Sequence, residues 1–231
     1  MPGSVALFLW CVGTLLEVCF VVCSLARKAF FRYFFLNLYF ILSVLTSAAR
    51  FLTLNAYGSS SDQYAHVYYY TDALLTVALF IALISLYSLV FGELGFSKQI
   101  RFAAVLLLLG TAAFSYGVVW QSEERLATSF AYELSQNLYF VGLVLTYILW
   151  GAVLKLREAR TRLVQFILSL GLYFSAYAAS YALVNLADKF SAVQYLSQLL
   201  ACLLPLSWSV TMLRHTEDSR IATAPLVAVQ R

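Results

Sequence analysis

The sequence predicts an all-α membrane protein: a polytopic bundle of seven transmembrane helices, with the N-terminus outside and the C-terminus in the cytoplasm. Three observations predict it: the apolar composition, seven long apolar runs, and an uneven distribution of basic residues. Of 231 residues, 62% are hydrophobic, 16% aromatic and 11% charged, whereas soluble domains carry about 25% charged residues. A chain with a mean hydropathy of +0.82 cannot hide this much apolar surface in water.

Each of the seven apolar runs is long enough to cross a bilayer, which needs about 20 helical residues. We place them at about residues 4–25, 33–54, 68–91, 102–120, 133–155, 163–185 and 194–213. The first run has no basic segment before it and no small-residue cleavage site after it, so we expect a retained helix. The runs form one transmembrane domain, residues 1–213, followed by a cytoplasmic tail, residues 214–231, that we expect to be flexible.

The orientation follows from the basic residues between the runs, because cytoplasmic loops of membrane proteins are enriched in Lys and Arg. Only Arg50, Arg125 and Lys189 lie on the side of the N-terminus. The other twelve lie on the opposite side: Arg27, Lys28, Arg32, Lys98, Arg101, Lys155, Arg157, Arg160, Arg162, Arg214, Arg220 and Arg231. We therefore expect a multi-pass protein of the cytoplasmic membrane, whose basic face contacts anionic headgroups of the lipid bilayer.

Polar residues gather where the third, fifth and seventh runs begin, at the outer face. They recur at helical spacing, so each set shares one helix face: Asp72 with Thr76, Glu133 with Asn137, and Gln194 with Gln198. Tyr70, Tyr132 and Tyr195 lie at the same level. If these faces converge, they form an acidic, aromatic pocket in the outer leaflet that suits a small cationic or amphipathic ligand.

The same residues also have a purely structural interpretation. Tyrosine is enriched at membrane interfaces in general. Carboxylates in the first turn of a helix interact favourably with the helix dipole and with free backbone amides. Asp72 and Glu133, which open their apolar runs, fit this description as well.

Three further polar residues lie within apolar runs, where they are costly and normally face protein or water. Glu17 is the deepest, roughly 20 Å from the start of its run. We expect Asn37 at a similar depth, within hydrogen-bonding reach of Glu17, either as part of a proton or cation relay or as a polar clasp between helices. Arg50 is expected to pair with Asp72 or Glu133, or to reach the headgroups.

Gly171, Ser175 and Ala179 recur every fourth residue in the sixth run. Such a row of small residues is typical of close packing against another helix. The row predicts either a neighbouring helix of the same chain or a second subunit at this face.

No motif in the chain indicates catalysis, so we expect no enzymatic activity and no catalytic residues. No lysine lies deep enough for a retinal Schiff base, and the only two histidines, His66 and His215, lie on opposite sides. No glycine loop indicates nucleotide binding, and the positive charge of +4 lies in short loops, so we expect no nucleic acid partner. Cys19 and Cys23, one helical turn apart, are better explained as small apolar residues than as metal ligands, so neither a metal nor a cofactor is expected.

The runs after the first show a weak internal repeat. Tyr70, Tyr132 and Tyr195, each opening a returning run, are spaced by 62 and 63 residues. One lone helix followed by three similar hairpins fits this spacing, and repeated hairpins occur in transporters. Seven similar helices with similar loops explain it equally well.

The segment RKAFFRYFFLNLYF, with SAARF and YYYTDALL after it, resembles a family of uncharacterised bacterial seven-helix membrane proteins of acidobacterial type. The basic turn of Arg27, Lys28 and Arg32, the outer Arg50, and Tyr69 with Asp72 carry this resemblance. It is specific over about residues 27–75, and the proline that the family often has after the basic turn is replaced by Phe34 and Phe35. The family has no assigned activity, so the resemblance implies only the fold and the membrane location.

These observations predict a small-ligand-binding or sensory seven-helix module that resembles a receptor. Without an output domain of its own, it would need a cytoplasmic or membrane protein partner, which the basic loops could bind. Two alternatives stay open. One is a small-solute transporter built from the hairpin repeats, and the other is a structural or assembly partner in which polar residues only join helices.

Overall fold

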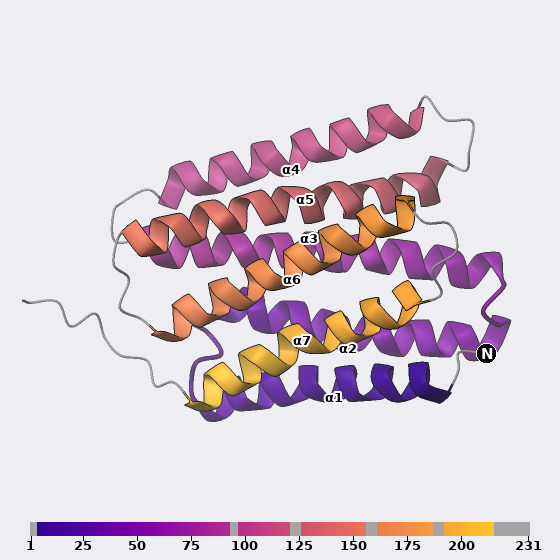
Figure 1. The fold of residues 1–231 in the computed structure, drawn as a ribbon, viewed down its shortest axis with the longest axis horizontal. Helices are drawn as coiled ribbons and strands as arrows, with labels where there is room; N and C mark the ends of the chain where they lie inside the picture. Colours follow the sequence, from indigo (N-terminus) through magenta and orange to yellow (C-terminus); the bar gives the residue numbers. More distant parts are fainter. Residues whose placement is uncertain (1–3, 93–96, 121–125, 156–160, 187–191, 215–231) are drawn as a thin grey trace, which may run out of the picture.

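The computed structural model describes the backbone of residues 4–92, 97–120, 126–155, 161–186 and 192–214. The side chains of residues 4–6, 97, 126–127, 181–186 and 192–198 are outside this description. Seven α-helices make up the described part (Figure 1): α1 (Ser4–Ala26), α2 (Phe34–Tyr57), α3 (Asp62–Phe91), α4 (Ser97–Trp120), α5 (Leu126–Lys155), α6 (Thr161–Leu186) and α7 (Ala192–Arg214). We call the end where α1 begins the N-terminal end of the bundle, and the end where α7 finishes the C-terminal end.

Three helices begin five or more residues earlier than their apolar runs predict. Helix α3 starts six residues before the expected position, α4 five and α5 seven. At α3 the reason is local: the Ser61 side chain accepts a hydrogen bond from the Tyr64 backbone N–H at 3.1 Å, which caps the helix, and Asp62 follows in the first turn. Polar residues that favour a helix start thus extend α3 beyond its apolar stretch.

The expectation that Asp72 and Glu133 open their helices is therefore wrong. Asp72 is the eleventh residue of α3 and Glu133 the eighth of α5. Both lie beyond the first turn, so neither caps the free amides at its helix start.

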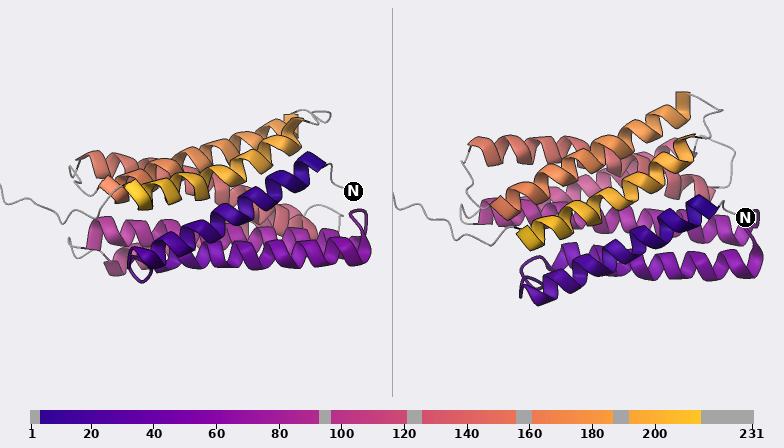
Figure 2. Two further views of the ribbon diagram at one scale, coloured as in Figure 1. Left: turned by 90° about the horizontal axis from the view of Figure 1, so that it is seen from below. Right: turned by 60° about the horizontal axis from the view of Figure 1, so that its bottom comes forward.

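Six helices form a closed ring in the order α1, α2, α3, α5, α6, α7, and α7 packs against α1 to complete it. Helix α1 packs against both α2 and α7, and the left view of Figure 2 shows it running obliquely between them. Helix α4 is outside the ring, packed mainly on α5 at the edge of the bundle (Figure 1). The three consecutive hairpins therefore do not occupy equivalent positions.

Aromatic side chains from opposite sides fill the ring. Trp208 of α7 lies 5.8 Å from the Phe20 ring and 5.5 Å from the Phe40 ring, between centroids. Phe166 of α6 packs on Trp208 at 5.4 Å and on Tyr33 at 5.1 Å. All five are almost fully buried. We call Phe20, Tyr33, Phe40, Phe166 and Trp208 the aromatic layer; it lies toward the C-terminal end.

Helices α5 and α6 approach closely at glycines. A Cβ on Gly142 would lie 2.6 Å from the Cζ atom of Phe174, and a Cβ on Gly171 would lie 3.2 Å from Cγ2 of Thr146. Ser175, one turn beyond Gly171, lies 3.3 Å from the Tyr147 hydroxyl. At Gly171 and Ser175 the row of small residues on α6 thus packs against a helix of the same chain.

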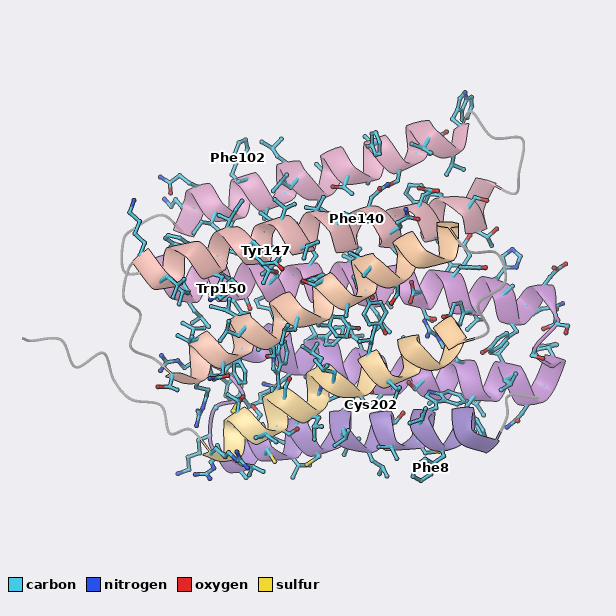
Figure 3. The ribbon with its side chains drawn as sticks, in the orientation of Figure 1. Phe8, Phe102, Phe140, Tyr147, Trp150 and Cys202 are labelled. Carbon is cyan, nitrogen blue, oxygen red and sulfur yellow. The ribbon has the colours of Figure 1, made fainter. Side chains whose placement is uncertain are left out.

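Within the described residues, six helices are long and apolar enough to cross a membrane. Large apolar side chains cover the outside of the bundle, including Phe8 and Phe102, which point away from it in Figure 3 and are 65% and 68% exposed. A soluble protein rarely exposes apolar surface of this extent. The chain is therefore a multi-pass membrane protein.

Candidate functional site

Asp72 of the expected outer pocket lies beside the intramembrane Arg50, where α2 meets α3 near the N-terminal end. Arg50 Nη2 is 3.9 Å from Asp72 Oδ1. Of the two acids expected to pair with Arg50, which were Asp72 and Glu133, the observed partner is therefore Asp72. Arg50 also donates from Nε to Thr71 Oγ1 at 2.7 Å and from Nη2 to the Tyr68 carbonyl at 3.2 Å, and its guanidinium lies 4.5 Å above the Tyr68 ring. This cluster joins two consecutive helices.

The other described residues of the expected pocket are spread over several contacts. Thr76 is buried, and its hydroxyl donates to the Asp72 carbonyl at 2.9 Å. Asn137 Nδ2 donates to Ser115 Oγ of α4 at 3.0 Å, a contact that joins α5 to the helix outside the ring. Glu133 is half-buried on α5.

The described tyrosines of the expected pocket also lie in separate contacts. The Tyr132 ring of α5 lies 6.4 Å from the Tyr69 ring of α3. Tyr70 is 50% exposed and stacks on His66 of its own helix. Tyr132 of α5 thus lies against α3, the helix that carries Asp72. Asn137, also on α5, instead contacts α4.

The residues expected from the seventh run are Gln194, Tyr195 and Gln198. Their backbone belongs to α7, but their side chains lie outside the described residues. Convergence of all three helix faces on one pocket stays a prediction.

Glu17 is buried in the middle of α1, at 9% exposure. Ser43 of α2 donates a hydrogen bond of 2.6 Å to its Oε1 atom. Among the described residues, Oε2 has no hydrogen-bond partner. A buried carboxyl oxygen without a partner is costly in a low-dielectric interior. A ligand or a proton that binds Glu17 Oε2 therefore lowers the free energy of the folded protein substantially.

The expected contact between Asn37 and Glu17 is wrong. Asn37 Nδ2 instead donates to the backbone carbonyls of Tyr33 at 2.9 Å and Phe30 at 3.2 Å. Helices α1 and α2 are antiparallel, and Glu17 lies nine residues from the end of α1, as Ser43 does from the start of α2. Asn37 is only three residues from that start, so it lies nearer the membrane surface than expected.

A tyrosine cluster lies above the aromatic layer, toward the N-terminal end. The Tyr173 hydroxyl of α6 is hydrogen-bonded to those of Tyr39 and Tyr177, so the chain of hydroxyls crosses the ring from α2 to α6. The Tyr139 ring of α5 stacks on Tyr177 at 5.0 Å. Tyr173 and Tyr177 are four residues apart, which places both on one face of α6.

The cluster and the two charged sites belong to one region. Glu17, Arg50 and Asp72 each interact electrostatically with the Tyr39 hydroxyl. Tyr39, Tyr139 and Tyr173 are almost fully buried. The upper half of the ring interior therefore combines carboxylates, phenol hydroxyls and aromatic faces, a combination that binds organic cations.

Within the described ranges, no three His, Cys, Asp or Glu side chains gather in a way that would hold a metal ion. The Cys19 and Cys23 sulfur atoms lie 3.9 Å apart on α1, and Cys19 is exposed.

No protein-family model, curated protein or solved structure matches this chain. The resemblance to the acidobacterial-type family stays a prediction.

Proposed function

We propose that this chain is a non-enzymatic small-ligand-binding or sensory membrane module whose ligand is an organic cation bound at Glu17. The observation that carries the proposal is the buried Oε2 atom of Glu17, which has no hydrogen-bond partner in the described structure. Ser43 fixes the carboxyl group through Oε1 and leaves Oε2 for a ligand. Tyr39 of the tyrosine cluster interacts electrostatically with Glu17 and supplies an aromatic face.

The aromatic layer supports a binding module in preference to a transporter. A solute path must reach both membrane faces. Phe20, only one turn from Glu17, packs with Trp208, Phe40 and Phe166 on the C-terminal side. These rings fill the ring interior on that side, so a ligand at Glu17 would be reached from the N-terminal end.

The topology that we propose has seven spans, with the N-terminal end outside and the C-terminal end in the cytoplasm of a bacterial cytoplasmic membrane. The basic residues support it, because Arg27, Lys28, Arg32, Arg162 and Arg214 all lie at the C-terminal end. A reporter fused after Arg231 tests the orientation. An enzyme active only outside the cytoplasm should be inactive there, and activity of that reporter would contradict the proposal.

The binding experiment uses the purified full chain in detergent and tetramethylammonium, tetraethylammonium and benzyltrimethylammonium as probes. A ligand at 100 times its Kd stabilises a protein by about 2.7 kcal/mol, so the unfolding temperature should rise with the concentration of at least one probe. The fluorescence of Trp208 should change over the same range, because its ring packs on Phe20, one turn from Glu17.

Two variants decide whether the response belongs to Glu17. Glu17→Gln should abolish both signals because it removes the negative charge and keeps the shape. Asp62→Asn removes the same charge at the exposed start of α3 and should respond as the natural chain does. No response to any probe, or an unchanged response in Glu17→Gln, would refute the proposal.

The second candidate is a structural or assembly partner, favoured by the contacts of Arg50 and Asn137, which join neighbouring helices. Under this interpretation Glu17 and Ser43 are a clasp between α1 and α2. Glu17→Leu would then lower the stability by about 1–3 kcal/mol, because it breaks this hydrogen bond and leaves the buried Ser43 hydroxyl without its acceptor. The organic cations would leave the natural chain unaffected.

A further inference from the structure

A groove of about 520 Å³ lies between α6 and α7 at the C-terminal end of the bundle. It lies at the other end from the tyrosine cluster and shares no lining residue with the proposed cation site. Along α7 it runs from Leu203 to Arg214, eleven residues or roughly 16 Å of helix. Its length thus covers about half of a membrane's hydrocarbon thickness.

The groove exists because short side chains face each other between the two helices. Ser169 of α6 and Ser207 and Thr211 of α7 line it. Their hydroxyl hydrogens are used inside the protein: Thr211 donates to the Ser207 carbonyl at 2.7 Å, and Ser207 donates to the Leu204 carbonyl at 2.9 Å. Ser169 donates to the Gln165 carbonyl and accepts from Trp208 Nε1 at 2.7 Å. The three hydroxyl groups that line the groove therefore already donate their hydrogen bonds within the protein.

The walls divide into an apolar part and a polar end. Leu203, Leu206 and Val210 line the part that lies deeper in the bundle, and Leu206 is 50% exposed. At the end of the bundle the lining changes to Gln165 and Arg214, both exposed. The lining thus matches a molecule with an alkyl chain and a polar head that lies at the membrane surface.

An anionic head fits this end, because Arg214 lines it and a second arginine contacts the last turn of α7. Arg27 Nη2 donates to the Leu213 carbonyl at 2.9 Å, which fixes Arg27 at the end of α7. Arg27 thus adds a second positive charge at the end of α7 where Arg214 lines the groove. Basic pockets between membrane helices bind anionic lipid headgroups, and arginine binds phosphate oxygens in pairs.

We propose that this groove is a binding site for one anionic glycerophospholipid, with an acyl chain along Leu203, Leu206 and Val210 and the phosphate at Arg214 and Arg27. Gln165 donates a further hydrogen bond to the headgroup from the α6 side. The lipid covers the hollow between two helices that belong to the ring, so its binding stabilises the contact between α6 and α7.

The test uses the full chain in nanodiscs with a small fraction of photoactivatable phosphatidylglycerol or phosphatidylcholine carrying the same acyl chains. Mass spectrometry then locates the label. The phosphatidylglycerol probe should label the α6 and α7 residues of the groove several times more than the phosphatidylcholine probe. Equal labelling by both lipids would mean ordinary lipid contact and would overturn the proposal. Absence of label from the groove, as when another segment of the chain fills it, would overturn it too.

Two variants and a matched control sharpen the result. Arg214→Gln should lower phosphatidylglycerol labelling about fivefold, or ~1 kcal/mol, the usual contribution of one basic residue near a lipid surface. Arg101→Gln removes the same charge from α4, which packs against neither α6 nor α7, and should have no effect. An equal loss in both would indicate a diffuse electrostatic effect and refute a site.

Filling the groove tests the acyl-chain part. Ser207→Phe places a ring between the helices without changing the charge, and it should remove the groove label while Arg27 and Arg214 stay in place. Dihexanoyl phosphatidylglycerol, which has the same headgroup on short chains, should compete poorly with the long-chain probe. Equal competition would show that only the phosphate is recognised, and it would contradict the acyl-chain site.

Discussion

Replacing Gly142 by alanine tests how α5 and α6 pack. The new Cβ would lie 2.6 Å from Phe174 Cζ and 2.9 Å from Cδ1, whereas carbon atoms in contact prefer about 3.5–4.0 Å. Phe174 is 1% exposed, so its ring has little room to move. Overpacking of this kind costs about 1–3 kcal/mol.

Gly151, nine residues further along α5, is the matched control. Nothing lies within 4 Å of a Cβ built there. Alanine in a helix is favoured over glycine by about 1 kcal/mol, and this gain applies to both positions. The free energy of unfolding of Gly142→Ala should therefore be about 1–3 kcal/mol below that of Gly151→Ala, measured by reversible unfolding in mixed micelles.

The clash is assigned to one ring by a double variant. Phe174→Leu removes Cζ and Cε1, the two ring atoms that the new methyl group would meet most closely. In that background Gly142→Ala should cost little, which gives a coupling of roughly 1–3 kcal/mol between the two positions. An equal cost of Gly142→Ala in both backgrounds, or equal stability of the Gly142 and Gly151 variants, would refute this account of the packing.

Two further predictions concern the charged residues, and both are measured as the free energy of unfolding in the same micelles. Asp72→Asn should cost less than about 1 kcal/mol, because the partly exposed ion pair spans 3.9 Å. Arg50→Met should cost about 2–3 kcal/mol, since Arg50 also makes two hydrogen bonds and a contact with the Tyr68 ring; equal costs would contradict this assignment. Lys28→Gly should add about 1 kcal/mol, because Lys28 has φ 54° at the end of α1, a conformation that glycine adopts without strain. Lys28→Ala loses the same charge but keeps the side-chain strain, so a gain equal to that of glycine would refute this reason.

The backbone at Lys28 also shows a limit of sequence analysis. The N–H groups of Lys28 and Ala29 donate to the carbonyls of Leu25 and Ser24 at 3.0 and 2.9 Å, which closes α1 with the pattern that usually has glycine at its left-handed position. A lysine there gives no such signal, although the basic turn itself was located correctly. The helix end is fixed by the buried Ala29 and Tyr33 that follow.

The pairing of Arg50 with Asp72 was predictable, whereas the partner of Glu17 was not. Arg50 and Asp72 lie on consecutive helices joined by a short turn, and opposite charges in an apolar environment attract over this distance. Glu17 could face any neighbour of α1. Its choice of Ser43 over Asn37 depends on how far α1 and α2 extend and on their relative rotation.

The sequence by itself determined the membrane class, the number of helices and the uneven charge of the two ends, because hydropathy, run length and loop charge are local properties. Only the tertiary structure decided which faces meet. Half of the apolar stretch of α3 is buried but only 17% of that of α4, although both are long and strongly apolar. Lipid tails are as apolar as a protein core, so hydropathy does not separate a face that packs on protein from one that faces lipid. The exclusion of α4, the aromatic layer and the groove beside Arg214 follow from shape and small-residue contacts, which exist only once the helices are assembled.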